Sequence, residues 1–268
     1  ILTYEEFFTL DYAKELAFKG KANLICGNNV YAHVPDINNF TAGIVELLDK
    51  NGTVTLEFPH LLKLIKYNQF DTIYHEHYSY LSLTTVKNIF SKYNLDIYDV
   101  EEISTHGGSL RVYGSHSSSR KNISSNVEKI LTEEDIFGLK DISTYISFQD
   151  KIDIVVKDFI KYITNAKNKN LKIAGYGAAA KGNTLLNFSK ITHHEIDFVC
   201  DASPLKINTL LPGSHIPVYD ISALSEHRPD IIIILPWNLS TEIVNILNNI
   251  NNWGAEYVSF IPSTIKHR

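Results

Sequence analysis

Residues Leu171–Asp201 read LKIAGYGAAAKGNTLLNFSKITHHEIDFVCD and carry the pattern that decides the fold. An apolar run at Leu171–Gly175 ends in a Gly-rich turn, a helix is predicted to open at Thr184–Phe188, and Ile196–Asp201 is again apolar. Because strands that alternate with helices form parallel sheets, this stretch predicts an α/β fold.

The same alternation continues downstream of this stretch. Ile231–Leu235 reads as a buried strand, Thr241–Asn249 as a helix and Tyr257–Ile261 as a last strand. Helical patterns fill the region upstream, from Asn126 to about Asn165. The second half of the chain is therefore predicted to be one α/β domain preceded by a helical linker over residues 121–170.

The first part of the chain predicts a separate α/β arrangement. Its expected elements are a helix over 4–18, a strand over 22–27, a helix that Asp36 caps, a turn at Asn51-Gly52, a strand over 53–58, a helix over 84–93, and strands over 96–103 and 110–115. The Gly107-Gly108 pair between the last two strands favours an antiparallel hairpin. A Ser-rich stretch at 115–125 predicts the domain boundary, which gives domains 1–115 and 116–268.

Composition excludes several classes of function. The 268 residues have a net charge of −5 and no long basic run, so nothing supports nucleic-acid binding. No apolar stretch approaches the ~20 residues of a membrane span, and no secretory signal opens the chain, so a cytoplasmic protein is expected. Cys26 and Cys200 each end an apolar run and are expected to be buried thiols.

Residues 70–80, FDTIYHEHYSY, combine titratable and phenolic side chains without a helical or strand period. Two histidines, His75 and His77, flank Glu76, with tyrosines around them. Acid–base chemistry is one interpretation, because histidine titrates near neutral pH and a carboxylate can orient it. A metal site that adds His60, His33 or Glu57 is a second, and histidines held only by structural hydrogen bonds are a third.

Three further segments follow predicted strands or turns and carry polar side chains. Asn28–Asp36 follows a strand, so it forms either a ligand contact or a turn with a helix cap. His106–Arg111 is either a hairpin turn or a place where Ser109 and Arg111 face a phosphate or sugar. Gly175–Thr184 is either a tight turn or an anion site at a helix N-terminus, with Lys181 as its cation; the LPWNL segment containing Trp237 would lie beside it or cap its strand.

Taken together, these segments resemble the S-adenosylmethionine-dependent C-methyltransferases that methylate nucleotide-linked deoxysugars. The matching stretches occur in the family's order and cover nearly the whole chain: NNVYAHVPD (28–36), EFPHLLKLI (57–65), FDTIYHEHYSYLSL (70–83), HGGSLRVYG (106–114), GYGAAAKGNTLLN (175–187), DASPLK (201–206), LPGSHIP (211–217) and LPWNL (235–239). The resemblance implies the back part of a Rossmann-like methyltransferase domain over 1–115, followed by a second Rossmann-like α/β domain. The resemblance implies S-adenosylmethionine as the cofactor. The family's N-terminal zinc-binding region and the Gly-rich start of its methyltransferase domain have no counterpart in this sequence. No metal ligand is therefore expected.

The resemblance also implies roles for individual residues. His77 is expected to be the general base that removes a proton beside the ketone of a nucleoside-diphosphate-linked 4-keto-6-deoxy sugar, with methylation at C3. Tyr74, Glu76 and His33 are expected to contact the sugar or tune His77, and Asn28 and Asn29 to contact the cofactor. The expected substrate-binding residues are His75, Ser109, Arg111, Lys181, Asn183 and Trp237.

Three rival functions stay open at this stage. A metal-dependent hydrolase would use His75, His77 and His60. A nucleotide-sugar-binding module would bind the same ligand without catalysis. A nicotinamide-dependent oxidoreductase would use the Gly175 turn, although the third glycine of the dinucleotide fingerprint is out of register there.

Overall fold

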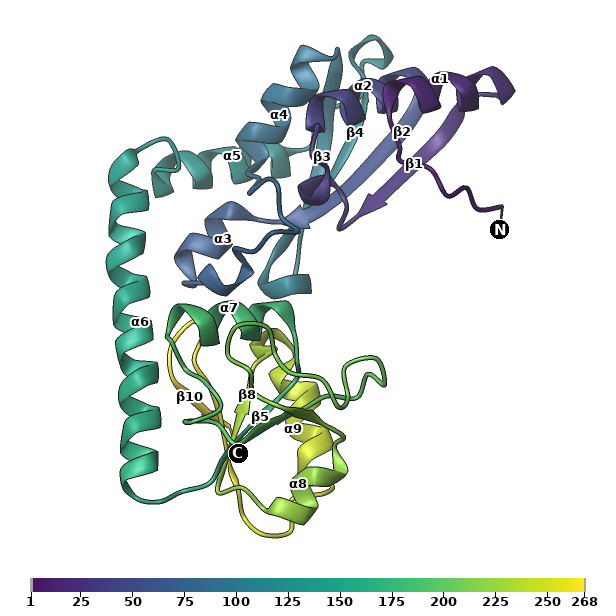
Figure 1. Cartoon of the computed structure of the whole chain (residues 1–268). Coiled ribbons are helices and arrows are strands. Elements are labelled where there is room, and N and C mark those ends of the chain that lie inside the picture. The colour runs from purple at the N-terminus through teal and green to yellow at the C-terminus, as the bar shows by residue number, and fades with distance from the viewer. Residues whose placement is uncertain (1, 268) are drawn as a thin grey trace. The chain divides into compact units, whose positions relative to one another are not determined.

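The computed structural model describes residues 2–267, which divide into two compact units (Figure 1). The first unit comprises residues 2–64 and 75–144, and the second comprises 65–74 and 145–267. The first unit continues past residue 115, where the sequence predicts the domain boundary. It does so because helix α5 (Ser125–Phe137) packs against strand β3 and helix α4 of the first unit. The segment 65–74 leaves the first unit and packs in the second.

The first unit contains one four-stranded sheet with helices against it. Its elements are α1 (Leu10–Lys19), β1 (Ala22–Asn28), α2 (Ile37–Leu47), β2 (Leu48–Pro59), α3 (Leu61–Lys66, which extends into the second unit), α4 (Leu83–Lys92), β3 (Leu95–Ile103), β4 (Ser109–His116) and α5. The strand order is β1-β2-β4-β3. Strands β1 and β2 are parallel, whereas β4 runs antiparallel to both neighbours, as the Gly107-Gly108 pair predicts.

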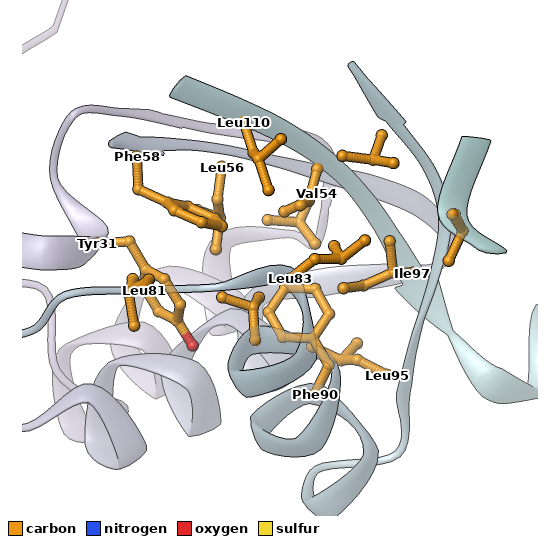
Figure 2. Close-up of a cluster of buried hydrophobic side chains, with 14 of the residues drawn as sticks. Tyr31, Val54, Leu56, Phe58, Leu81, Leu83, Phe90, Leu95, Ile97 and Leu110 are labelled. Atoms are coloured by element: carbon orange, nitrogen blue, oxygen red, sulfur yellow. The ribbon is translucent and has the colours of Figure 1, made fainter. Parts of the chain in front are cut away.

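The core of the first unit fills the space between this sheet and helix α4 (Figure 2). Val54 and Leu56 point inward from β2, and Phe90 of α4 meets them. All three side chains are fully buried. Their alternation on the strand and helical spacing on α4 are the sequence signals that predict both elements. Burial of side chains of this size contributes about 1.5–3 kcal/mol each.

Two predictions for the first unit need correction. The helix predicted over 4–18 begins only at Leu10, because the side chain of Thr9 caps it by accepting the backbone N–H of Tyr12. The Asn51-Gly52 turn lies inside the long strand β2. There the pairing with β1 shifts between Ala22 and Leu24, so the turn residues form an irregularity of the strand rather than its start.

The second unit contains a six-stranded sheet with helices packed against it. Its elements are α6 (Ile142–Asn168, which begins in the first unit), β5 (Ile173–Tyr176), α7 (Ala180–Phe188), β6 (Phe198–Cys200), β7 (Val218–Tyr219), α8 (Ser222–His227), β8 (Ile231–Ile234), α9 (Ser240–Asn248), β9 (Glu256–Ser259) and β10 (Ile265–His267). The strand order is β10-β9-β8-β5-β6-β7. Only β10 is antiparallel to its neighbour, so the predicted parallel sheet is confirmed.

Helix α7 begins earlier than the sequence predicts. Its first residue is Ala180 rather than Thr184, which places Lys181 inside the first helical turn. The sequence does not predict β7, α8 or β10, because two to six residues are too few to show a period.

The two cysteines lie in different environments. Cys200 is buried in the second sheet, as predicted, but Cys26 is exposed because β1 is an edge strand with a mostly exposed burial pattern. No helix within residues 2–267 is both long and apolar enough to cross a membrane.

Candidate functional site

Two histidines from distant parts of the sequence meet in the first unit. The ring centroids of His33 and His77 are 4.7 Å apart, with the planes inclined by 65°. The ring of Tyr80 also lies near His77, with its centroid 6.0 Å away in an edge-on arrangement. The rings of His33, His77 and Tyr80 therefore lie together, and the roles expected of His33 and His77 stay predictions.

Backbone hydrogen bonds hold these segments together. The backbone N–H groups of Tyr78 and Ser79 both donate to the carbonyl of Ala32, at 2.9 and 3.2 Å. Ala32 belongs to the short 3₁₀ helix η1 (Tyr31–His33), which the buried ring of Tyr31 anchors in the core. His33 thus approaches the 75–80 segment from a rigid support, and its Nε2 atom is buried without a hydrogen-bond partner among the described residues.

The other residues of the motif are more accessible. His75 and Glu76 form an exposed turn, and Tyr74 and His77 are half-buried. Tyr74 is the last residue of the segment that packs in the second unit. The site therefore offers a pair of half-buried imidazoles, His33 and His77, and an exposed imidazole and carboxylate at His75 and Glu76.

The predicted cofactor residues lie at the carboxyl end of β1. Asn28 is exposed there and pairs in register with Glu57 of β2. Asn29 has a positive φ of 53°, and its N–H donates to the carbonyl of Glu57 at 2.9 Å. Asparagine tolerates this left-handed conformation better than most residues, so the turn interpretation also accounts for Asn29.

Ser109 and Arg111 make contacts that a hairpin requires. The Oγ atom of Ser109 donates to the carbonyl of Thr105 at 3.0 Å, and Ser109 is buried. The guanidinium of Arg111 donates to the buried carboxylate of Glu57 at 3.0 Å, and Thr105 donates to the same carboxylate at 2.9 Å. Glu57 therefore ties the hairpin to β2, and about a third of the Arg111 side chain stays exposed.

In the second unit, the candidate residues gather at the carboxyl ends of β5 and β8. The chain order of the strands reverses between these two neighbours, and such reversals are where open α/β sheets bind ligands. Gly177 follows β5 with a φ of +90°, and a Cβ there would lie 2.4 Å from the ring of Pro236, which follows β8. Only glycine allows the two strand ends to approach this closely.

Four interacting side chains lie at this position. The Nε1 atom of Trp237 donates to Oδ2 of Asp71 at 2.7 Å, and the Nζ atom of Lys181 lies 4.7 Å from the centre of a Trp237 ring. Lys181 also donates to the side-chain oxygen of Asn238 at 3.2 Å. Asp71 is 1% exposed and Lys181 9%, so both charges are removed from water.

Burial shifts both pKa values towards the neutral forms. It raises the pKa of Asp71 to about 7, against the opposing effects of the Trp237 hydrogen bond and the Lys181 charge. It lowers the pKa of Lys181, against the opposing charge of Asp71. Such mutually dependent, perturbed groups are common at functional sites, although structural pairs show them too.

Some of the backbone N–H groups near the start of α7 that could bind an anion already donate to acceptors within the protein. The N–H of Asn183 donates to the carbonyl of Ala179, and the N–H of Ala178 donates to Oδ2 of Asp201 at 2.7 Å. The backbone amide of Asn183 is therefore used within the helix, because α7 begins early enough to include it. The side-chain Oδ1 atom of Asn183 is buried without a partner among the described residues.

His60 contacts a carboxylate rather than the other histidines that a metal site would require. It is 1% exposed, and its Nε2 atom lies 2.8 Å from Oε1 of Glu134, which is equally buried. Across residues 2–267, no three His, Cys, Asp or Glu side chains are grouped in a way that could hold a metal ion.

Sequence reasoning missed Asp71, Tyr80 and Glu134. Asp71 and Tyr80 lie within the FDTIYHEHYSY stretch, but only tertiary contacts distinguish them from its other polar residues. Glu134 gave no sequence signal, because it follows Glu133 on a helix with many charged residues and looks like a solvated position.

Comparison with known families assigns both parts of the chain. A family model described as a C-methyltransferase C-terminal domain matches residues 104–262, and one described as a methyltransferase domain matches residues 3–100. C-methyltransferase NovU from Streptomyces niveus is 34% identical over 256 residues, which cover 95% of this chain and 61% of that protein. The chain thus spans about three-fifths of the length of this relative.

Solved structures with some likeness to the chain include a methyltransferase. The magnesium protoporphyrin IX methyltransferase ChlM from Synechocystis PCC 6803, determined with bound SAH, aligns with a TM-score of 0.29 and 15% identity, over 36% of this chain and 46% of that chain. A likeness of this size supports no conclusion about the present chain.

The fold and the family matches define an α/β protein of the methyltransferase class. The match over residues 104–262 covers more than half of the chain, so the protein belongs to the C-methyltransferase family.

Proposed function

We propose that the protein takes part in S-adenosylmethionine-dependent methylation of carbon in a nucleoside-diphosphate-linked 4-keto-6-deoxy sugar, at C3. The observation that carries this proposal is the pairing of His33 with His77 in a chain of the C-methyltransferase family. Carbon is a poor nucleophile unless a neighbouring ketone makes its proton removable, so a carbon methyltransferase needs a base at this place.

His77 is the proposed base. It takes the proton from the carbon next to the ketone, and the electrons of the broken C–H bond form an enolate with its charge on the ketone oxygen. The half-buried position of His77 keeps the imidazole accessible to a sugar, while Tyr80 and His33 fix its ring. A phenol or a second imidazole beside the ring provides hydrogen bonding to the developing oxyanion.

Tyr74, His75 and Glu76 are proposed to contact the sugar or to tune the base. The exposed turn at His75 and Glu76 leaves both side chains available for a polar ligand. The buried and unpartnered Nε2 atom of His33 supports a similar role, because a substrate hydroxyl would satisfy it.

Asn28 and Asn29 are proposed to contact the cofactor. The side chain of Asn28 is exposed at the carboxyl end of a parallel strand, and its amide fits the hydroxyl and amino groups of a nucleoside. The described residues thus fit one edge of a nucleoside site. When bound, S-adenosylmethionine would supply an electrophilic methyl group. As the bond from the sugar carbon to the methyl group forms, the methyl–sulfur bond would break and its electron pair would stay on sulfur as a neutral thioether.

Lys181, Asn183 and Trp237 of the second unit are proposed to bind a nucleotide. Ser109 and Arg111 of the first unit are proposed, separately, to bind a sugar or phosphate group. Lys181 offers a positive charge at the carboxyl ends of β5 and β8, and Trp237 offers an aromatic face beside it. Binding there would replace the hydrogen bond between Lys181 and Asn238.

The general-base role predicts the behaviour of His77→Asn. A positioned base contributes about 10²–10⁴-fold, so this variant should lose turnover by that range and keep its affinity for the sugar nucleotide. Methyl transfer is measured by mass spectrometry of the product. Proton removal is measured separately, as exchange of the sugar C3 hydrogen in deuterated water without a methyl donor.

The matched control is His194→Asn, which changes an exposed histidine of the second unit. Turnover of His77→Asn within threefold of the wild type would exclude His77 as the base. Exchange without methyl transfer in the wild type would leave the base in place and contradict the methylation proposal.

A further inference from the structure

Within the first unit, backbone contacts join the chain that precedes segment 65–74 to the chain that follows it. His60 and Leu81 form a parallel backbone bridge, and the N–H of Leu61 donates to the carbonyl of Leu81 at 2.9 Å. Residues 61–80 therefore form a loop, here called the 61–80 excursion, of which residues 65–74 pack in the second unit. The contacts of His60 and Leu61 with Leu81 join its two ends and are here called its stem. The motif residues His75–His77 lie near its returning end, so the geometry of the stem affects where their side chains point.

One carboxylate from a distant helix contacts both sides of this stem. Glu134 of α5 is 1% exposed, and its Oε1 atom accepts from Nε2 of His60 at 2.8 Å and from the N–H of Leu83 at 2.6 Å. Its Oε2 atom accepts from the N–H of Thr84 at 2.9 Å and from the Thr84 hydroxyl at 2.6 Å. His60 precedes the excursion, and Leu83 and Thr84 follow it.

The same carboxylate completes the N-terminus of helix α4. The first N–H groups of a helix have no partner within it, and negative charge is favoured beside them. Ser82 caps the N–H of Thr85, and Glu134 accepts the N–H groups of Leu83 and Thr84. A carboxylate in this position is ionised: burial raises the pKa of Glu134, but the hydrogen bonds from His60, Thr84 and Leu83 outweigh it and hold the pKa below its ordinary value.

The negative charge of Glu134 determines the direction of the four hydrogen bonds that it makes. An ionised carboxylate only accepts, so Nε2 of His60 carries the hydrogen that points to Glu134. Hydrogen bonds to a charged group in a buried site are stronger than neutral ones, and removal of one partner leaves the others unpaired. The four contacts therefore act as one unit rather than as four independent bonds.

We propose that Glu134 is a positioning residue that closes the stem of the 61–80 excursion and thereby orients His77 for proton transfer. The catalytic part of this inference rests on the function proposed above, whereas the structural part does not. Glu134 has no role in binding ligand, and it acts only through His60, Leu83 and Thr84.

The test compares Glu134→Gln and Thr84→Val with the wild type. Glutamine keeps the shape but places an NH₂ group against the donors, and valine removes only the hydroxyl donor, so the second variant stays informative if the first folds poorly. Glu133→Gln is the matched control, because Glu133 is a half-exposed neighbour on the same helix that pairs with Lys129 at 3.9 Å. Hydrogen–deuterium exchange is followed at residues 61–81 and at strands β2 and β4.

In Glu134→Gln, the amides of residues 70–80 should exchange about tenfold faster or more, while those of β2 and β4 stay within about twofold. Thr84→Val should show the same pattern with a smaller change. The nuclear Overhauser contact between the rings of His33 and His77 should weaken, and turnover should fall through kcat with the KM for S-adenosylmethionine unchanged.

Unchanged exchange at 61–81, or an equal increase in β2 and β4, would overturn the proposal, because Glu134 would then have no stem function or only general stability. Altered exchange with unchanged turnover would overturn its catalytic part. A wild type that transfers no methyl group, with the exchange pattern as expected, would contradict the proposed function and leave the stem intact.

Discussion

At the scale of single residues, two of the buried carboxyl groups, Glu134 and Asp71, differ in how their charge is stabilised. Glu134 is surrounded by four donors and remains ionised. Asp71 has the indole of Trp237 and the nearby charge of Lys181, which do not fully offset its burial, so its pKa rises to about 7. The number and type of donors around a buried carboxyl thus decide its charge more than burial alone does.

The raised pKa of Asp71 predicts a pH dependence of stability. The folded state holds the proton between the ordinary value of 3.8 and about 7, where the unfolded state releases it. Stability should therefore fall as pH rises through this window and level off above about 7, by on the order of a few kcal/mol. Urea unfolding at several pH values measures this, and Asp71→Asn should remove the slope.

Asp158→Asn serves as the comparison for this experiment, because Asp158 is exposed on α6. A slope that persists in Asp71→Asn, or an equal loss of slope in Asp158→Asn, would show that another group titrates in this window.

At the scale of elements, the turn between β5 and α7 positions the cluster of the second unit. Gly177 combines a positive φ with close approach to Pro236, and helix α7 starts three residues later. The early start of the helix places Lys181 on its first turn and next to Trp237. The element boundary therefore determines which groups remain available to a ligand.

Substitution of glycine by alanine can separate the effect of a positive φ from the effect of close approach to Pro236. Gly177→Ala introduces both backbone strain and a clash with Pro236, whereas Gly254→Ala, at φ +84°, introduces strain alone because nothing lies within 4 Å of its Cβ. Both variants should be destabilised, and Gly177→Ala should lose about 1–3 kcal/mol more. Chemical denaturation measures the difference, and equal losses would mean that Pro236 moves away without cost.

At the scale of the whole molecule, the chain crosses between its two units through segment 65–74. This segment belongs to the sequence that matches a methyltransferase domain, yet it packs in the unit that matches the C-terminal domain. Asp71 is part of it. The charge state of one residue in the methyltransferase match therefore contributes to the stability of the other unit.

The two units should consequently respond to acid with opposite signs. Between about pH 7 and 5, protonation of Asp71 should stabilise the second unit. The lowered pKa of Glu134 provides stability to the first unit above its ordinary value of 4.5, and this stability is lost as pH falls further through the folded pKa. Amide exchange at β2 and β5, corrected for intrinsic rates, measures each unit separately, and parallel changes in both would contradict the prediction.

The sequence predicts the parallel second sheet, the antiparallel hairpin and the Asp36 cap, because period, turn glycines and capping residues act over a few positions. It does not predict the exposure of Cys26, because exposure depends on whether a strand has neighbours on both sides. The roles of its site residues in binding and catalysis stay predictions.

The sequence by itself determined the two α/β parts, the order of their elements and the family to which the chain belongs. Only the tertiary structure decided that Asp71 joins the second unit, that Glu134 closes the stem before and after the histidine motif, and that Lys181 packs beside Trp237. These contacts join residues 50 to 166 positions apart. No local pattern encodes them, because the donors that surround a buried charge are brought together only when the chain has folded.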